Sequence, residues 1–133
     1  MNKHARSILI TGAALAFVGV ALGAFGAHAL KARLAADMLA VYQTGVQYHL
    51  AHAIGIVLVG ILVQMVPASK WLPMAAWTMT AGIIIFSGSL YLLSVTGLRM
   101  LGAVTPLGGI AFLAAWLMVA IGVVKANAAK VAG

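Results

Sequence analysis

The amino-acid sequence predicts an all-α integral membrane protein: a bundle of four helices that forms a single transmembrane domain over residues 1–133. Two observations predict this class. First, 65% of the 133 residues are hydrophobic and only 7% are charged, whereas soluble domains carry about 25% charged residues. Second, the apolar residues form four blocks of about 20 residues or slightly more, the length that a helix needs to cross the hydrocarbon core of a bilayer.

The four blocks occupy residues 7–29, 46–66, 72–96 and 104–124. Helix is the required conformation, because an open strand in lipid leaves backbone groups without hydrogen-bond partners. The first block follows a basic start and resembles a signal peptide, but it is longer than the usual apolar region of about 7–15 residues. We therefore expect the first block to be a retained membrane helix.

Short connections separate the later blocks. Pro67 and Pro73 bracket the loop between the second and third helices, and Gly97 follows the third. Thr105 and Pro106 are typical of an N-cap followed by proline at the first helical position. Because the connections are short, we expect neighbouring helices to be antiparallel.

The connection between the first and second helices is longer and carries charges of both signs. Its apolar residues recur at helical spacing, opposite its charged residues, so we expect a short interfacial amphipathic segment over residues 30–45 that leads into the second helix. The apolar residues are Leu30, Leu34, Met38 and Val41, and the charged ones are Lys31, Arg33 and Asp37.

The basic residues predict topology and partners. Four crossings place both termini on one side, and an excess of Lys and Arg marks cytoplasmic loops. The net charge of +7 is scattered between apolar blocks without a nucleic-acid-binding patch or motif, so we expect membrane lipids as partners and no nucleic acid. Five basic residues against three favour cytoplasmic termini in the inner membrane: Lys3, Arg6, Lys70, Lys125 and Lys130 against Lys31, Arg33 and Arg99.

Glycines on the first helix predict close helix packing. Gly12, Gly19, Gly23 and Gly26 are spaced by seven, four and three residues, so they fall on one face. Small residues let helix backbones approach in a membrane, where the hydrophobic effect contributes little to association. Two interpretations stay open: packing inside the four-helix bundle, and an interface with other copies in a homo-oligomer or larger complex.

A few polar side chains at membrane depth are the candidate ligand- or partner-binding residues. Ionisable residues in membrane helices are costly and usually face a bundle interior or a cavity. We expect His49 and His52 to share one face of the second helix with Tyr48, and His28 to approach them from the end of the first helix. The candidates are His28, Gln47, Tyr48, His49, His52, Ser87, Ser89 and Tyr91.

These side chains allow several roles. The first interpretation is a polar bridge between the first and second helices, made by the histidines and Tyr48. The others are binding of a small molecule, lipid or quinone, binding of a metal or haem iron, and proton transfer. Ser87 and Ser89 are expected to bond to carbonyls one turn earlier or to another helix.

The sequence contains no complete catalytic motif. Asp37 is the only carboxylate side chain and there is no cysteine, which excludes paired-carboxylate and two-metal chemistry, thiolate nucleophiles and Cys-ligated clusters. The glycines lie inside apolar helices rather than in a nucleotide-binding loop. We therefore expect no enzyme activity, no catalytic residues, no metal site and no cofactor.

Four segments occur in a specific order and together cover nearly the whole chain. They are GAFGAHAL (23–30), YQTGVQYHLAHA (42–53), FSGSLYLLSVTG (86–97) and VTPLGGIAFLAAW (104–116). In this combination the chain resembles the YgdD-like family of small bacterial membrane proteins, which is catalogued as a domain of unknown function. The resemblance implies a four-helix inner-membrane protein, and it implies no activity or catalytic residues.

The sequence thus predicts a small multi-pass membrane protein that acts as a non-enzymatic accessory, scaffolding, or lipid- or small-ligand-interacting component. The alternative is an oligomeric transport or channel-like protein, in which several copies line a pathway with Ser87, Ser89, Tyr91 and the histidines. A third hypothesis is a redox component that binds haem, metal or quinone through His28 and His52.

Overall fold

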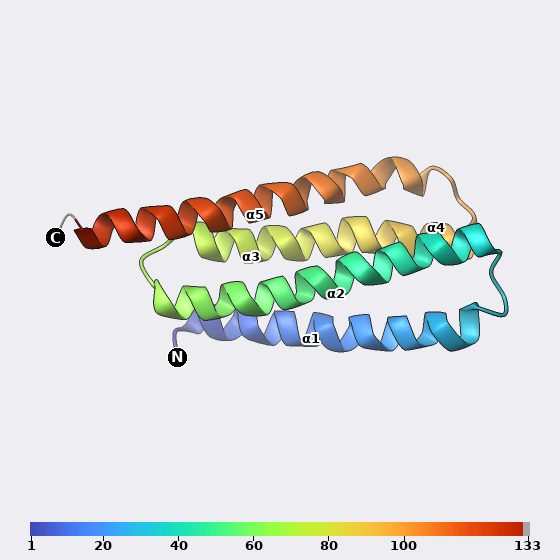
Figure 1. Ribbon diagram of the computed structural model, residues 1–133, viewed down its shortest axis with the longest axis horizontal. Coiled ribbons are helices and arrows are strands. Elements are labelled where there is room, and N and C mark those ends of the chain that lie inside the picture. Colours follow the sequence, from blue (N-terminus) through green and yellow to red (C-terminus); the bar gives the residue numbers. More distant parts are fainter. Residues whose placement is uncertain (132–133) are drawn as a thin grey trace.

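The computed structural model describes residues 1–131, with side chains through Ala126, so the side chain of Lys130 lies outside the described residues. Its helices lie side by side as four antiparallel rods (Figure 1). Two short π-helical segments, η1 and η2, continue the rods without breaking them. The elements are α1 (Lys3–Phe25), η1 (Gly26–Leu30), α2 (Ala36–Met65), α3 (Trp71–Gly82), η2 (Ile83–Ser87), α4 (Gly88–Thr96) and α5 (Leu101–Val131).

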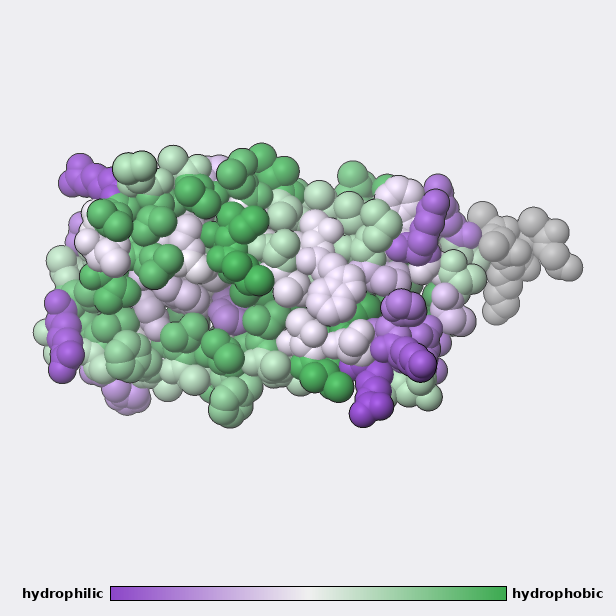
Figure 2. Space-filling model, turned by 180° about the vertical axis from the view of Figure 1, so that it is seen from behind, coloured by the Kyte–Doolittle hydropathy of each residue, from purple (hydrophilic) through white to green (hydrophobic). Residues whose placement is uncertain are grey.

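The outside of the bundle is suited to lipid. Large apolar side chains point outward, and Phe17 and Leu113 remain 77% and 74% exposed. Figure 2 shows hydrophobic side chains over the middle of the molecule and hydrophilic ones at its two ends. Four segments are long and apolar enough to span a membrane, which confirms the predicted fold class: Lys3–Leu30, Ala36–Met65, Trp71–Thr96 and Leu101–Ala126.

The amphipathic segment expected over residues 30–45 is not a separate element. A tight turn spans residues 31–35, and residues 36–45 are the first turns of α2. The helix starts early because no breaker precedes Gly45, and Asp37 in its first turn is favourable beside the positive end of the helix dipole. The apolar side of this extension packs into the bundle, where Tyr42 is buried, while Asp37 is exposed.

The expected N-cap at Thr105 is wrong. Helix α5 begins at Leu101, after Gly97 has ended α4 in the left-handed conformation (φ 71°) that favours glycine. The Thr105 hydroxyl oxygen lies 3.2 Å from the carbonyl oxygen of Leu101, and Pro106 lies inside the helix. A proline is tolerated there because neighbouring hydroxyls and helices can satisfy the backbone groups that it frees in a membrane.

Small residues face large ones where α1 packs against α2. Gly12, Gly19 and Gly26 are seven residues apart, and so are their partners Ile56, His49 and Tyr42 on the antiparallel α2, while Gly23 lies between them. All four glycines therefore pack against α2 of the same chain, which is the first of the two interpretations. A Cβ would meet Ile56 and Val57 at Gly12, His49 and Leu50 at Gly19, Val46 at Gly23, and Tyr42 at Gly26.

Glycines also face large side chains where the third rod, formed by α3, η2 and α4, packs against α5. A Cβ added to Gly122 would lie 3.0 Å from Leu72, and one added to Gly82 would lie 2.5 Å from the Phe112 ring. At Gly108 it would lie 2.7 Å from the Cα of Phe86. The closest approach of these two rods is therefore between backbones, at the π-helical segment η2.

Candidate functional site

His49 connects three of the rods. Its Nε2 lies 2.9 Å from the carbonyl oxygen of Leu15 in α1, and its Nδ1 lies 3.1 Å from the hydroxyl of Tyr91 in α4. Because a carbonyl only accepts, Nε2 carries a hydrogen, and in the neutral ring Nδ1 accepts from the Tyr91 hydroxyl. The side chain is 3% exposed. Both nitrogens of this buried imidazole are therefore used in holding helices together.

Gly19 makes the contact between His49 and Leu15 possible. It lies one turn after Leu15 on α1, and a Cβ there would come within 3.3 Å of the His49 ring and 2.7 Å of Leu50. Without that Cβ, the imidazole can pass over the helix surface and reach the Leu15 carbonyl. The glycine therefore supports a polar contact as well as close packing.

The same arrangement recurs seven residues away. The Tyr42 hydroxyl donates to the carbonyl of Leu22 at 2.8 Å. A Cβ at Gly26, one turn after Leu22, would collide with the Tyr42 ring. Two polar side chains of α2 thus reach carbonyls of α1 across two glycines at equivalent positions.

His52 connects α2 to α5. Its Nδ1 lies 2.8 Å from the carbonyl of Tyr48, and the indole N–H of Trp116 donates to its Nε2 at 3.2 Å. Because an indole N–H only donates, Nε2 is unprotonated and Nδ1 carries the hydrogen. The ring also stacks on Phe112 with a centroid separation of 3.5 Å. Neither nitrogen of His52 is free to bind a metal ion or haem iron.

His28 does not join the other two histidines. It is exposed in η1, beside Gly26, which packs against Tyr42. His52 lies ten residues beyond Tyr42 on α2, which is roughly 15 Å at 1.5 Å per residue. In the part of the chain that the structure describes, no three His, Cys, Asp or Glu residues are placed to hold a metal ion.

The expected histidine cluster is therefore not formed. The bridge between the first and second helices is made by His49, whereas His52 faces α5. Tyr48 takes no side-chain part in that bridge, and Gln47 is exposed. The structure thus contains a polar bridge between the first and second helices, but of the residues expected there His49 alone makes it, without His28, His52 or Tyr48.

The serines of the third rod differ from each other. The Ser89 hydroxyl donates to the carbonyl of Phe86 at 2.8 Å and lies 2.7 Å from the hydroxyl of Thr105 in α5. Ser87 is fully buried, and its hydroxyl has no hydrogen-bond partner among the described residues. Ser89 thus links two rods, while the Ser87 hydroxyl makes no hydrogen bond that would offset its burial.

A groove opens on the side of the bundle between α2, η2 and α5. It has a volume of about 500 Å³. Aromatic rings form much of its wall, with Tyr48 and Phe86 at a centroid separation of 4.6 Å and Phe86 and Phe112 at 5.5 Å. It is lined by Tyr48, His52, Phe86, Pro106, Gly109, Ile110, Phe112, Leu113 and Trp116.

Among the described residues of this groove, only Tyr48 has a polar side-chain group without a hydrogen-bond partner. The side chain is 42% exposed, and its hydroxyl forms no hydrogen bond with the described residues, whereas both nitrogens of His52 are occupied. Tyr48 lies close to the middle of the 30-residue helix α2, which is long and apolar enough to span a membrane. The groove therefore combines apolar walls with a single available hydrogen-bonding group.

Sequence reasoning identified two residues of the groove, Tyr48 and His52, and missed its other walls. Phe112 and Trp116 are four residues apart and so share a helix face, which was an available signal. Nothing local connects them to Phe86, because the Phe86 ring meets the Phe112 ring only through the packing of η2 against α5.

The chain is similar to membrane proteins of other bacteria. A family model described as a protein of unknown function (DUF423) matches residues 22–109. The UPF0382 membrane protein YwdK of Bacillus subtilis is 48% identical over 117 residues, which cover 88% of this chain and 95% of that protein. The UPF0382 inner membrane protein YgdD of Escherichia coli is 38% identical over 120 residues, which cover 90% and 91% of the two chains.

No solved structure shows a significant match. The matches to the two relatives extend over nearly the full length of both chains, and they confirm the resemblance to the YgdD-like family. The chain belongs to the DUF423 (UPF0382) family of membrane proteins, a family of unknown function.

Proposed function

We propose that this protein is a non-enzymatic membrane component that binds a flat, apolar molecule from the lipid phase in the groove between α2, η2 and α5. The observation that carries the proposal is the Tyr48 hydroxyl, which stands at the groove near the middle of a membrane-spanning helix without a partner among the described residues. A polar group without a hydrogen bond is costly in an apolar medium. An oxygen atom of a bound ligand would remove that cost.

The walls of the groove indicate the ligand class. Aromatic side chains favour stacked or edge-to-face contacts with other rings, and Phe86, Phe112 and Trp116 all line the groove. The Trp116 N–H already donates to His52, so the Tyr48 hydroxyl is the group that would form a hydrogen bond with the ligand. These features favour a planar ring that carries a carbonyl or hydroxyl oxygen, and isoprenoid quinones are membrane-soluble molecules of that class.

The polar residues support binding rather than catalysis. Both buried histidines have both ring nitrogens in hydrogen bonds. Asp37, the only carboxylate side chain, is exposed at the start of α2 and far from the groove along that helix. General acid–base chemistry needs a titrating group within hydrogen-bond reach of the substrate, and none of these groups meets that requirement.

The transport hypothesis receives less support. It requires polar side chains that line a pathway, but four of the groups expected there are bonded within the bundle: His49, His52, Ser89 and Tyr91. The Ser89 hydroxyl is paired with Phe86 and Thr105, and the Tyr91 hydroxyl is paired with His49. These contacts stabilise helix packing within a single chain.

Location in the inner membrane with cytoplasmic termini is part of the proposal. A relative is named an inner membrane protein, and α1 begins at the end of the bundle where α5 ends (Figure 1). More Lys and Arg residues lie at that end than at the other, which favours the cytoplasmic side. Green fluorescent protein fused to the C-terminus should therefore fluoresce, and an active alkaline phosphatase fusion at the same point would reverse this orientation.

Quenching of Trp116 fluorescence tests the groove. Replacing Trp71 and Trp77 by Phe leaves Trp116 as the only indole, and a short-tailed ubiquinone added to the protein in detergent should quench it saturably. Tyr48→Phe should weaken binding about fivefold, since a neutral hydrogen bond contributes about 1 kcal/mol. Gly109→Leu should abolish saturation, because it fills the groove while its Cβ makes only an ordinary 3.8 Å contact with Phe86.

Gly88→Leu is the matched control. A Cβ at Gly88 meets nothing within 4 Å. Gly88 is two residues after Phe86, so it points about 200° away from Phe86 around the helix. This variant should bind like the parent protein. Quenching that grows linearly with quinone, or that persists unchanged in Gly109→Leu, would show that the quinone meets Trp116 only by collision in the micelle.

A further inference from the structure

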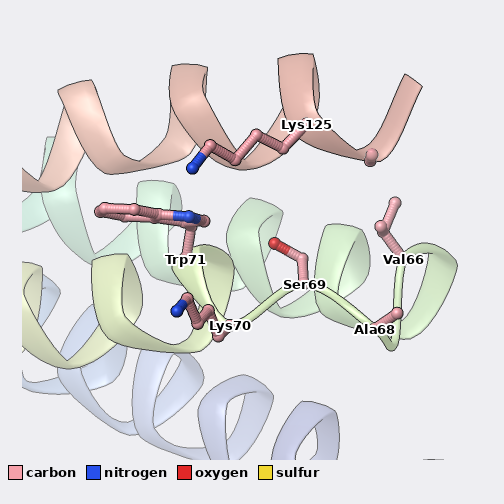
Figure 3. A pocket seen from close by; sticks show the side chains of 7 residues that line it. Val66, Ala68, Ser69, Lys70, Trp71 and Lys125 are labelled. Carbon is pink, nitrogen blue, oxygen red and sulfur yellow. The ribbon is translucent and has the colours of Figure 1, made fainter. Parts of the chain in front are cut away.

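A second cavity lies at the end of the bundle where α1 begins. It lies between the loop after α2, the start of α3 and the last described turns of α5 (Figure 3), and it has a volume of about 320 Å³. Its location and its residues are separate from those of the groove. The lining residues are Val66, Ala68, Ser69, Lys70, Trp71, Lys125 and Ala126.

Two lysines from distant parts of the chain share this cavity. The Lys125 ammonium lies 5.1 Å from the centre of the Trp71 ring, within range of a cation–π interaction, and Lys70 immediately precedes α3. Asp37, the only carboxylate side chain, lies at the start of α2, at the opposite end of the bundle (Figure 1). No side-chain carboxylate can therefore neutralise either ammonium group.

The cavity also presents uncharged hydrogen-bond donors. The Ser69 hydroxyl oxygen is buried and has no partner among the described residues, and Figure 3 shows it pointing into the space between the loop and α5. Helix α3 begins beside it without a side-chain cap, so the N–H groups of Trp71 and Leu72 lack intrahelical partners, while Pro73 has no N–H. Helix N-termini favour anions for this reason and because of the helix dipole.

We propose that this cavity binds the phosphate group of an anionic phospholipid. Two ammonium groups, a free hydroxyl and a helix N-terminus all favour a tetrahedral anion with several acceptor oxygens. A lipid is favoured over free phosphate because Trp71 belongs to the class of residues found at headgroup level. Val66, Ala68 and Ala126 also give one side of the cavity an apolar surface that suits the glycerol portion.

Lipid titration followed by native mass spectrometry tests the proposal. The full chain in detergent is titrated with phosphatidylglycerol or with phosphatidylcholine of the same acyl chains, and phosphatidylglycerol should bind more tightly. Lys70→Met and Lys125→Met should each weaken phosphatidylglycerol binding about fivefold, the equivalent of about 1 kcal/mol per basic residue. Phosphatidylcholine binding should change less in both variants, because its choline cation offsets the charge of its phosphate group.

Lys31→Met is the matched control, because it removes the same charge at the opposite end of the bundle. It should leave the preference for phosphatidylglycerol intact. Both tested lysines are exposed, so their replacement creates no hole in the core, and Ser69→Ala provides a further variant without a charge change. The proposal is overturned if the two lipids bind equally, if Lys31→Met acts like Lys125→Met, or if excess inorganic phosphate displaces the bound lipid.

Discussion

Replacing His49 by leucine tests whether this residue holds three rods together. The substitution removes the hydrogen bond to the Leu15 carbonyl at 2.9 Å and the one to the Tyr91 hydroxyl at 3.1 Å. The Leu15 carbonyl keeps its place in the helix, but the Tyr91 hydroxyl loses its acceptor. The main cost therefore falls on Tyr91.

The magnitude follows from these contacts. Interhelical hydrogen bonds in membranes contribute about 0.6 kcal/mol each on average, so the loss of two costs about 1 kcal/mol. Leaving the partly buried Tyr91 hydroxyl without an acceptor costs about 1–3 kcal/mol more. His49→Leu should therefore lower the free energy of unfolding by about 2–4 kcal/mol.

A double-mutant cycle isolates the pair. In the parent protein, Tyr91→Phe removes one good hydrogen bond and should destabilise the bundle. In the His49→Leu background the same change removes only an orphaned hydroxyl, so it should cost nothing or restore some stability. The free energies are measured by reversible unfolding in mixed micelles with increasing dodecyl sulfate, followed by circular dichroism.

Tyr42→Phe is the control for this cycle, because the Tyr42 hydroxyl bonds to Leu22 and not to His49. Its cost should add to that of His49→Leu, within the roughly 0.5 kcal/mol expected for independent sites. If Tyr91→Phe is equally additive, His49 and Tyr91 are not coupled, and the proposed bridge to α4 is wrong.

Two further pairs of substitutions test the packing of the third rod. Gly108→Ala should lower the free energy of unfolding by about 1–3 kcal/mol, because its Cβ would lie 2.7 Å from the Cα of Phe86. Gly88→Ala, where the Cβ has open space, should raise the free energy of unfolding by up to about 1 kcal/mol. Equal effects in chemical unfolding would contradict the close backbone contact. Ser89→Ala should lose about 1 kcal/mol with its two bonds, whereas Ser87→Ala should be neutral or stabilising, because that hydroxyl has no partner among the described residues. A loss at Ser87 that equals the loss at Ser89 would reveal a hidden partner.

Local sequence features were enough to predict four helices and the apolar part of each. Few backbone conformations are possible in lipid, so four apolar blocks require four helices. The third was predicted over residues 72–96 and spans Trp71–Thr96, while the first was predicted over 7–29 and spans Lys3–Leu30. The start of the second helix was placed at residue 46 rather than at Ala36. The reason is that mixed charge was taken as the mark of a separate interfacial element, although a helix can extend beyond the hydrocarbon core.

The partners of the polar side chains could not be predicted in the same way. His49 and His52 are three residues apart, which places them about 60° apart around α2. That difference is small enough to suggest a shared face, yet it directs one ring toward α1 and α4 and the other toward α5. Which rod lies opposite each ring depends on how four helices pack around one another. Local sequence does not determine that packing, because it is set by contacts between residues that are far apart in the chain.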